Sequence, residues 1–239
     1  SGWSRTSLDQ CGEYKMTYGV RLVNDRDQIN VDDNNPIYYV VQEGVYTQTV
    51  KYPNSIVFDE SYRHTLQTPL VFVKPNAGGG QLCMLLKYFG SAGNWQGCEW
   101  HTTTVPGAAP GVVGGRYKVV VPFMPKSTGW GMHVMDSAGQ IVFDSGYKPA
   151  IFTGGSQYWT YYAWNPNPPG GGGSGVNSWQ SVPGMPADTY FCITGLMEDW
   201  DGRNTMIGDL WGNRQYLYVV QWRSYQNKGV YPSPLLMIK

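Results

Sequence analysis

The stretch YGVRLVNDRDQINVDD at residues 18–33 returns as WGMHVMDSAGQIVFDS at residues 130–145, aligned without a gap at an offset of 112 residues. In each copy, apolar and polar residues alternate on both sides of a turn-forming segment, NDRDQ in the first and DSAGQ in the second. Alternation with a period of two is typical of a strand, and Asn, Asp and Gly favour the turn between two strands. The sequence therefore predicts the same β-hairpin twice.

The two copies differ at the turn and agree in the segment after the hairpin. Gly139 of the second copy stands at the position of Asp27, where we expect a positive φ angle. A proline comes after each hairpin and precedes a further apolar strand, at 37–42 after the first and 150–152 after the second. Proline is tolerated at the start of a strand because its missing N–H lies at the end of the ladder.

The rest of the chain consists of short apolar runs separated by Gly, Pro and Asn clusters, without a convincing helical period. Such spacing favours an all-β sandwich or barrel. A period near 112 residues indicates a duplicated domain, because solenoid repeats are only about 20–50 residues long. We therefore predict an all-β fold of duplicated antiparallel β-sandwich units. Residues 1–15 form an N-terminal extension or tag remnant, 16–126 the first sandwich repeat and 127–239 the second.

Two segments are rich in Gly and Pro. The stretch 165–179, NPNPPGGGGSGVNSW, predicts a mobile exposed loop that cannot form a strand, and 104–115 is a milder version. Neither segment is charged, which argues against an arm that binds nucleic acid and favours packing against another protein surface.

Composition excludes several classes of partner. The 239 residues contain 31 Gly and 16 Pro, and only 14% are charged, with a formal net charge of zero. The chain has no basic footprint for nucleic acid or an anionic membrane. It has no apolar run of the roughly 18–20 residues that a membrane span needs, so we expect no membrane insertion.

Four cysteines, at positions 11, 83, 98 and 192, are irregularly spaced and form no C-x-x-C pair, which argues against zinc. Cys83 and Cys98 flank a Gly-rich turn and could form a disulfide across a hairpin. The alternative is four reduced thiols in a protein assembled in a bacterial cytosol.

No sequence motif of catalysis or nucleotide binding is present. His64 lies near two acids but has no second clustered His. The densest acidic group, Glu198, Asp199 and Asp201 with Asn204, departs from the calcium-loop pattern and is better explained by an Asp-Gly turn. We predict no enzymatic activity, no metal and no cofactor.

Aromatic residues are concentrated in two strand-like runs, QYWTYYAW at 157–164 and QYLYVVQW at 215–222. Both faces of the first run carry rings, and one thin sandwich cannot easily bury both, so some rings should be exposed. Tyr and Trp build recognition surfaces, and flat rings also suit sugars. The competing interpretation is that these rings fill cores or subunit interfaces. Our candidate binding residues are Trp159, Tyr161, Trp164 and Trp179.

The repeated motif resembles segments of tail-tip and tail-fibre proteins of long-tailed bacteriophages. Those proteins often carry an N-terminal version similar to MTYGVRLVND directly after the initiating Met, the place that Met16 holds here. The second copy is closer to the pattern than the first, which lacks the turn Gly. The resemblance covers roughly 25 residues per copy.

The resemblance implies a virion structural protein of the distal tail, assembled in the bacterial host cytoplasm. It implies contacts with other phage tail proteins, with a bacterial surface glycan or protein receptor, and between copies of the chain, with a trimer favoured.

Two other functions stay open. A free carbohydrate-binding or adhesin module could use the same aromatic rings without any virion. A glycan-cleaving enzyme could use acids such as Glu198, Asp199 or Asp201.

Overall fold

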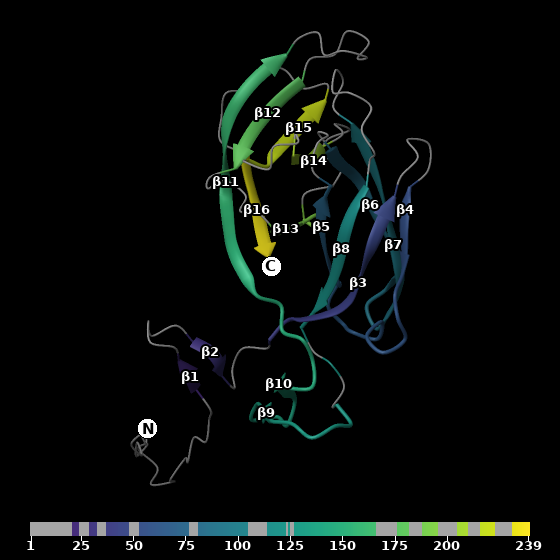
Figure 1. Cartoon of the computed structure of the whole chain (residues 1–239), viewed down its shortest axis with the longest axis vertical. Helices are drawn as coiled ribbons and strands as arrows, with labels where there is room; N and C mark the ends of the chain where they lie inside the picture. The colour runs from purple at the N-terminus through teal and green to yellow at the C-terminus, as the bar shows by residue number, and fades with distance from the viewer. Residues whose placement is uncertain are drawn as a thin grey trace, which may run out of the picture. The chain divides into compact units, whose positions relative to one another are not determined.

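A computed structural model describes residues 21–23, 29–32, 37–47, 53–76, 81–104, 114–122, 124, 127–165, 176–181, 188–195, 205–209, 216–222 and 231–239. These residues form sixteen strands and no helix, which confirms the all-β prediction (Figure 1). The described part of the chain contains no helix long and apolar enough to cross a membrane.

Twelve strands form one hydrogen-bonded antiparallel series, in the order β3-β8-β5-β13-β16-β11-β12-β15-β14-β6-β7-β4. Their bounds are β3 Tyr39–Thr47, β4 Asn54–Val57, β5 Leu70–Pro75, β6 Gln81–Ser91, β7 Asn94–Thr104, β8 Gly114–Val121, β11 Phe152–Asn165, β12 Val176–Ser181, β13 Tyr190–Cys192, β14 Thr205–Asp209, β15 Tyr218–Trp222 and β16 Tyr231–Ile238.

The longest strand, β11, connects two sheets. Its first part, from Phe152 to Trp159, pairs with β16, and its second part, from Trp159 to Asn165, pairs with β12. Counting β11 in both, the series makes a six-stranded and a seven-stranded sheet. Rings from the two sheets meet between them, as in the edge-to-face pair of Tyr46 on β3 and Trp100 on β7. The antiparallel β-sandwich is therefore confirmed.

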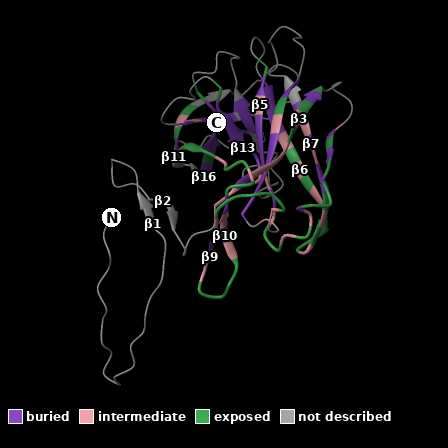
Figure 2. Cartoon of the chain, turned by 60° about the horizontal axis from the view of Figure 1, so that its bottom comes forward, coloured by how far each residue is buried: buried purple, intermediate pink, exposed green. Residues whose placement is uncertain are grey.

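The interior of the sandwich follows from alternation along each strand. On β5, Val71 and Val73 point into the main core, whereas Phe72 belongs to a smaller apolar cluster with Val120 and Tyr190. The six-stranded sheet is therefore apolar on its inner face and partly apolar on its outer face. Figure 2 shows β5 and β13 almost wholly buried.

The sandwich contains strands from both predicted repeats. Strand β13 lies between β5 and β16, and β14 lies between β15 and β6. The predicted repeats 16–126 and 127–239 therefore contribute strands to one series, and their buried residues share one core, a point that the sequence left open. The chain divides instead into residues 1–37 with 125–146, and residues 38–124 with 147–239. The sequence repeat does not set the boundary of the sandwich, because the twelve-strand series needs strands from both halves of the chain.

The repeat itself is confirmed as two hairpins with the same register. Strands β1 (Arg21–Val23) and β2 (Ile29–Asp32) correspond at an offset of 112 to β9 (His133–Met135) and β10 (Ile141–Asp144). Arg21 pairs with Asp32 as His133 pairs with Asp144, and both hairpins have an irregularity at the same place. Gly139 has a φ of 81°, as predicted.

Two other predictions need correction. The stretch 165–179 is not all loop, because Val176 begins β12 and Asn165 ends β11. The Gly-rich segment between Cys83 and Cys98 is the turn of a hairpin, as expected, but the strand after it, β7, was not among the predicted strand-like runs. Residues 1–15 lie outside the described part of the chain.

Candidate functional site

The second hairpin is built around a buried carboxylate. Asp144 ends β10 and is completely buried. Its Oδ1 accepts hydrogen bonds from the Ser127 hydroxyl and the Gly146 N–H, both at 2.8 Å, and its Oδ2 accepts one from the Ser127 N–H at 2.8 Å. The Nε2 atom of His133 lies 3.1 Å from Oδ2. We call Ser127, His133, Asp144 and Gly146 the Asp144 cluster.

The hydrogen bonds decide the charge state of Asp144. Burial alone would raise the pKa of its carboxyl, because desolvation disfavours the charged form. The three hydrogen bonds and the adjacent His133 ring outweigh burial and hold the pKa of Asp144 below its usual range. Gly146 is required for this geometry, since a Cβ there would lie 2.5 Å from the Ser127 hydroxyl oxygen.

The Asp144 cluster contains Ser, His and Asp but is not arranged as a catalytic triad. A triad needs the carboxylate on one ring nitrogen of His and the hydroxyl on the other. Here Asp144 and Ser127 approach the same nitrogen, at 3.1 and 3.5 Å, and Ser127 also donates directly to Asp144. The arrangement joins the segment before β9 to the end of β10.

The first hairpin repeats only part of this cluster. Asp32 and Arg21 stand where Asp144 and His133 stand, but Lys15 and Asn34 replace Ser127 and Gly146. The side chains of these first-copy residues lie outside the described part of the chain.

The second hairpin also exposes large apolar side chains. Trp130 is fully exposed, and Met132 and Met135 are each about half exposed. Only Val134 and Val142 are fully buried in its apolar cluster, with Ile37 and Phe143 packed against them. Exposed large apolar side chains gathered on one small element suit contact with another surface.

The aromatic strand is placed differently from our prediction. Trp159 and Trp179 are 0% and 2% exposed and belong to the sandwich core. They are therefore not part of an exposed recognition surface, contrary to our expectation. Tyr161 is partly buried against the same core and packs edge-to-face on Trp179. The side chain of Trp164 lies outside the described part of the chain. Register explains the error, since Trp159 and Tyr161 point inward on β11.

The expectation that some rings on this strand are exposed does hold for other residues. Tyr162 points to the opposite face of β11, is 47% exposed, and packs edge-to-face on Tyr218 of β15. Tyr216, just before β15, is also exposed. Alternation from Trp159 could have separated Tyr162 from the core set, but the sequence could not show which face was inside.

The remaining predicted groups add no site. Cys83 and Cys98 are free and buried, and they pair across β6 and β7 with Thr102 and Tyr88, so they form no disulfide. Burial raises the pKa of each thiol to about 12. Glu198, Asp199 and Asp201 lie outside the described residues. Within the described ranges, no group of three His, Cys, Asp or Glu side chains is placed to hold a metal.

Comparison with protein-family models, curated proteins and solved structures finds no match to this chain.

Proposed function

We propose that this chain is a non-enzymatic virion protein of the distal tail of a bacteriophage, acting in tail assembly, in recognition of the host surface, or in both. The observation that carries the proposal is the repeated hairpin. Its two copies share strand bounds, register and irregularity at an offset of 112 residues, over the same residues that resemble phage tail-tip and tail-fibre proteins.

The exposed side chains support a role in contact. Trp130, Met132 and Met135 of the second hairpin give a partner an apolar surface. In a tail, that partner is a neighbouring tail protein or another copy of the chain, and we propose a homo-oligomer, with a trimer favoured.

Antibody labelling of intact virions that carry this gene tests the proposal. We expect gold label at the distal end of the tail, and none on virions of a phage that lacks the gene. Recovery of the protein only in the soluble fraction of infected cells, with unlabelled virions, would contradict it.

A free carbohydrate-binding or adhesin module is the second candidate, favoured by the exposed rings of Tyr162 and Tyr216. Such a module would bind bacterial cells without any virion. Unlabelled virions, together with saturable cell binding that is lost in a Tyr162→Ala/Tyr216→Ala variant, would favour this candidate.

A further inference from the structure

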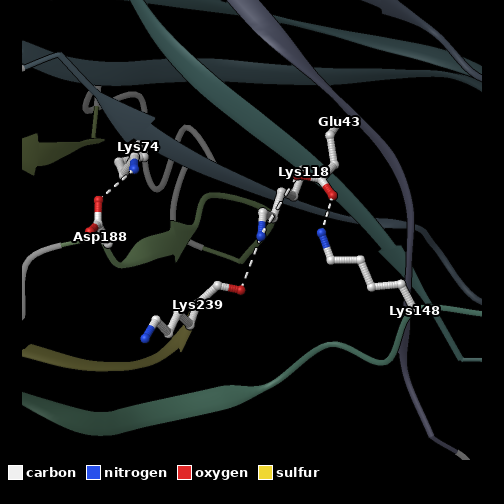
Figure 3. A network of polar contacts seen from close by, with 6 residues as sticks. All are labelled: Glu43, Lys74, Lys118, Lys148, Asp188 and Lys239. Carbon is white, nitrogen blue, oxygen red and sulfur yellow. Dashed lines mark hydrogen bonds and ion pairs between the residues drawn. The ribbon is translucent and has the colours of Figure 1, made fainter.

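The outer face of the six-stranded sheet carries a group of cations that the proposed function does not use. We call Lys74 on β5, Arg116 and Lys118 on β8, and Lys148 before β11 the cationic face (Figure 3 draws the three lysines). The register places Lys74 beside Arg116 and Phe72 beside Lys118 on neighbouring strands.

Two carboxylates lie among these four cations. Glu43 of β3 accepts a hydrogen bond from Lys148, and its Oε2 is 3.9 Å from the Nζ of Lys118. Asp188 is largely exposed, and its Oδ1 lies 3.1 Å from the Nζ of Lys74. The cationic face therefore retains an excess of positive charge in a chain whose formal net charge is zero.

Lys118 is the buried member of the cationic face, with its side chain only 7% exposed. Its Nζ donates to the main-chain oxygen of Lys239 at 3.0 Å and lies 4.6 Å from the centre of the Tyr190 ring. The Nζ of Lys74 lies 5.1 Å from the same ring. Burial, together with the nearby Lys148 and Lys74, lowers the pKa of Lys118 despite Glu43. The sheet thus holds several cations close together, where an added anion would relieve their repulsion.

One partly exposed ring, that of Phe152, adjoins the cations on the same face. Ile238 of β16 pairs with Tyr190 on one side and with Phe152 of β11 on the other. The ring of Phe152 packs on Phe72 with centroids 6.4 Å apart and is 43% exposed. Because Phe72 and Lys74 lie on the same face of β5, the ring of Phe152 and the cations belong to one face of the sheet.

We propose that the cationic face and Phe152 bind a polysaccharide that carries carboxylate groups, with the cations paired to the carboxylates and the ring packed on a sugar. The inference rests on the host-recognition part of the proposed function. A peptide cannot add as a strand here, because β5 and β8 each have paired neighbours on both sides. Recognition at this face therefore depends on side-chain charge and ring packing.

Binding of the purified full chain to three polymers tests the inference. The probes are carboxymethyl-dextran, unmodified dextran, which has the same backbone without carboxylates, and poly-L-glutamate, which has carboxylates without sugars. We expect the tightest binding to carboxymethyl-dextran, none to dextran, and a loss of affinity as salt rises, because exposed charges are screened at about 10 Å in 0.1 M salt.

Variants locate the site. Lys74→Gln with Arg116→Gln should weaken carboxymethyl-dextran binding about threefold to tenfold, as expected for two partly exposed ion pairs. Phe152→Ala should weaken binding to carboxymethyl-dextran and leave any binding to poly-L-glutamate unchanged. Lys87→Gln, on exposed Lys87 of β6 in the other sheet, is the matched control and should have no effect. Lys118→Gln is avoided because it removes the cation beside Glu43 and the donor to the main-chain oxygen of Lys239.

Three outcomes would overturn the inference: equal binding to dextran and carboxymethyl-dextran, equal loss in the Lys87→Gln control, or no polymer binding at low salt. Binding to poly-L-glutamate as tight as to carboxymethyl-dextran would assign the face to an acidic protein partner instead. Virion labelling is independent of all these measurements, so failure of this site and failure of the proposed function are distinguishable.

Discussion

Trp159 in the sandwich and Asp144 in the second hairpin are both completely buried, yet they stabilise their surroundings by different forces. Around Trp159, large side chains from both sheets, such as Trp100 and Phe191, form one continuous core. Around Asp144, the apolar cluster of the hairpin has only two buried residues, Val134 and Val142. Polar contacts therefore contribute a larger share of the stabilisation of the hairpin. A short hairpin buries little apolar area, and a hydrogen-bonded carboxylate compensates for this.

The largest loss of stability should come from a substitution in the core of the sandwich. Trp159→Ala removes a fully buried ring and should lower the free energy of unfolding by about 3–5 kcal/mol, because it leaves a cavity in a packed core. Urea denaturation followed by circular dichroism measures this. Trp130→Ala, which truncates a fully exposed ring of the same type, is the matched control and should change stability by less than about 0.5 kcal/mol. Similar losses in both variants would show that Trp159 is not a core residue.

In the hairpin, Asp144→Asn should lower the free energy of local opening by about 1–3 kcal/mol. The substitution replaces one acceptor oxygen with an NH₂ group. That group faces either the Ser127 hydroxyl and the Gly146 N–H, or the Ser127 N–H. Amide hydrogen exchange of residues 133–144 reports the opening. Glu99→Gln on β7 removes a carboxylate from the sandwich and should leave exchange in the hairpin unchanged. Unchanged exchange in Asp144→Asn would mean that the carboxylate does not hold the hairpin.

The two regions should also differ in their response to acid. The pKa of Asp144 is lowered in the folded hairpin, so its contribution is fully present above the unfolded value of about 3.9 and is lost as pH falls through the lower folded value. The amide signals of Ser127 and Gly146 should therefore move below about pH 4 in nuclear magnetic resonance spectra, and Asp144→Asn should abolish the movement. A movement that persists in Asp144→Asn would show that another group is responsible.

The smallest loss of stability should come from a substitution in the turn of the second hairpin. Gly139→Ala should destabilise the hairpin by about 1 kcal/mol, because a φ of 81° is strained for a residue with a Cβ. Gly129→Ala is the matched control, since a Cβ meets nothing within 4 Å at either position and only Gly139 has a positive φ. Exchange of the Gln140 amide compares the two variants. Equal effects would show that the turn does not require the left-handed conformation.

The sequence was sufficient for the features that depend on local pattern. The repeat, the two hairpins and the turn at Gly139 were all predicted from alternation and turn residues within about sixteen residues. Most strands of the sandwich were predicted for the same reason. The Asp144 cluster could not be predicted, because Ser127 and Gly146 lie outside the repeated motif and only the fold brings them to the carboxylate.

The features that depend on pairing between strands far apart in the sequence could not be predicted. Nothing in the apolar run of β5 indicates that its neighbour is β13, which is more than 100 residues away. For the same reason, alternation on β11 separated Trp159 and Tyr161 from Tyr162 but did not show which set faced the core. The cationic face was not predicted because Lys74, the pair Arg116 and Lys118, and Lys148 lie on three segments that only the fold brings together.

Because β5 pairs with a strand that is far away in the sequence, this pairing can form only late during synthesis of the chain. Strand β5 is completed at Pro75, but its partner β13 begins only at Tyr190, and the Val71 N–H finds its acceptor on Thr194, 123 positions later. At about 5–20 residues per second, a ribosome needs on the order of 10 s to make the missing segment. During that interval β5 has an unpaired edge, which is a site for association with other nascent chains. We therefore expect yield in a heterologous host to depend strongly on translation rate and on chaperones.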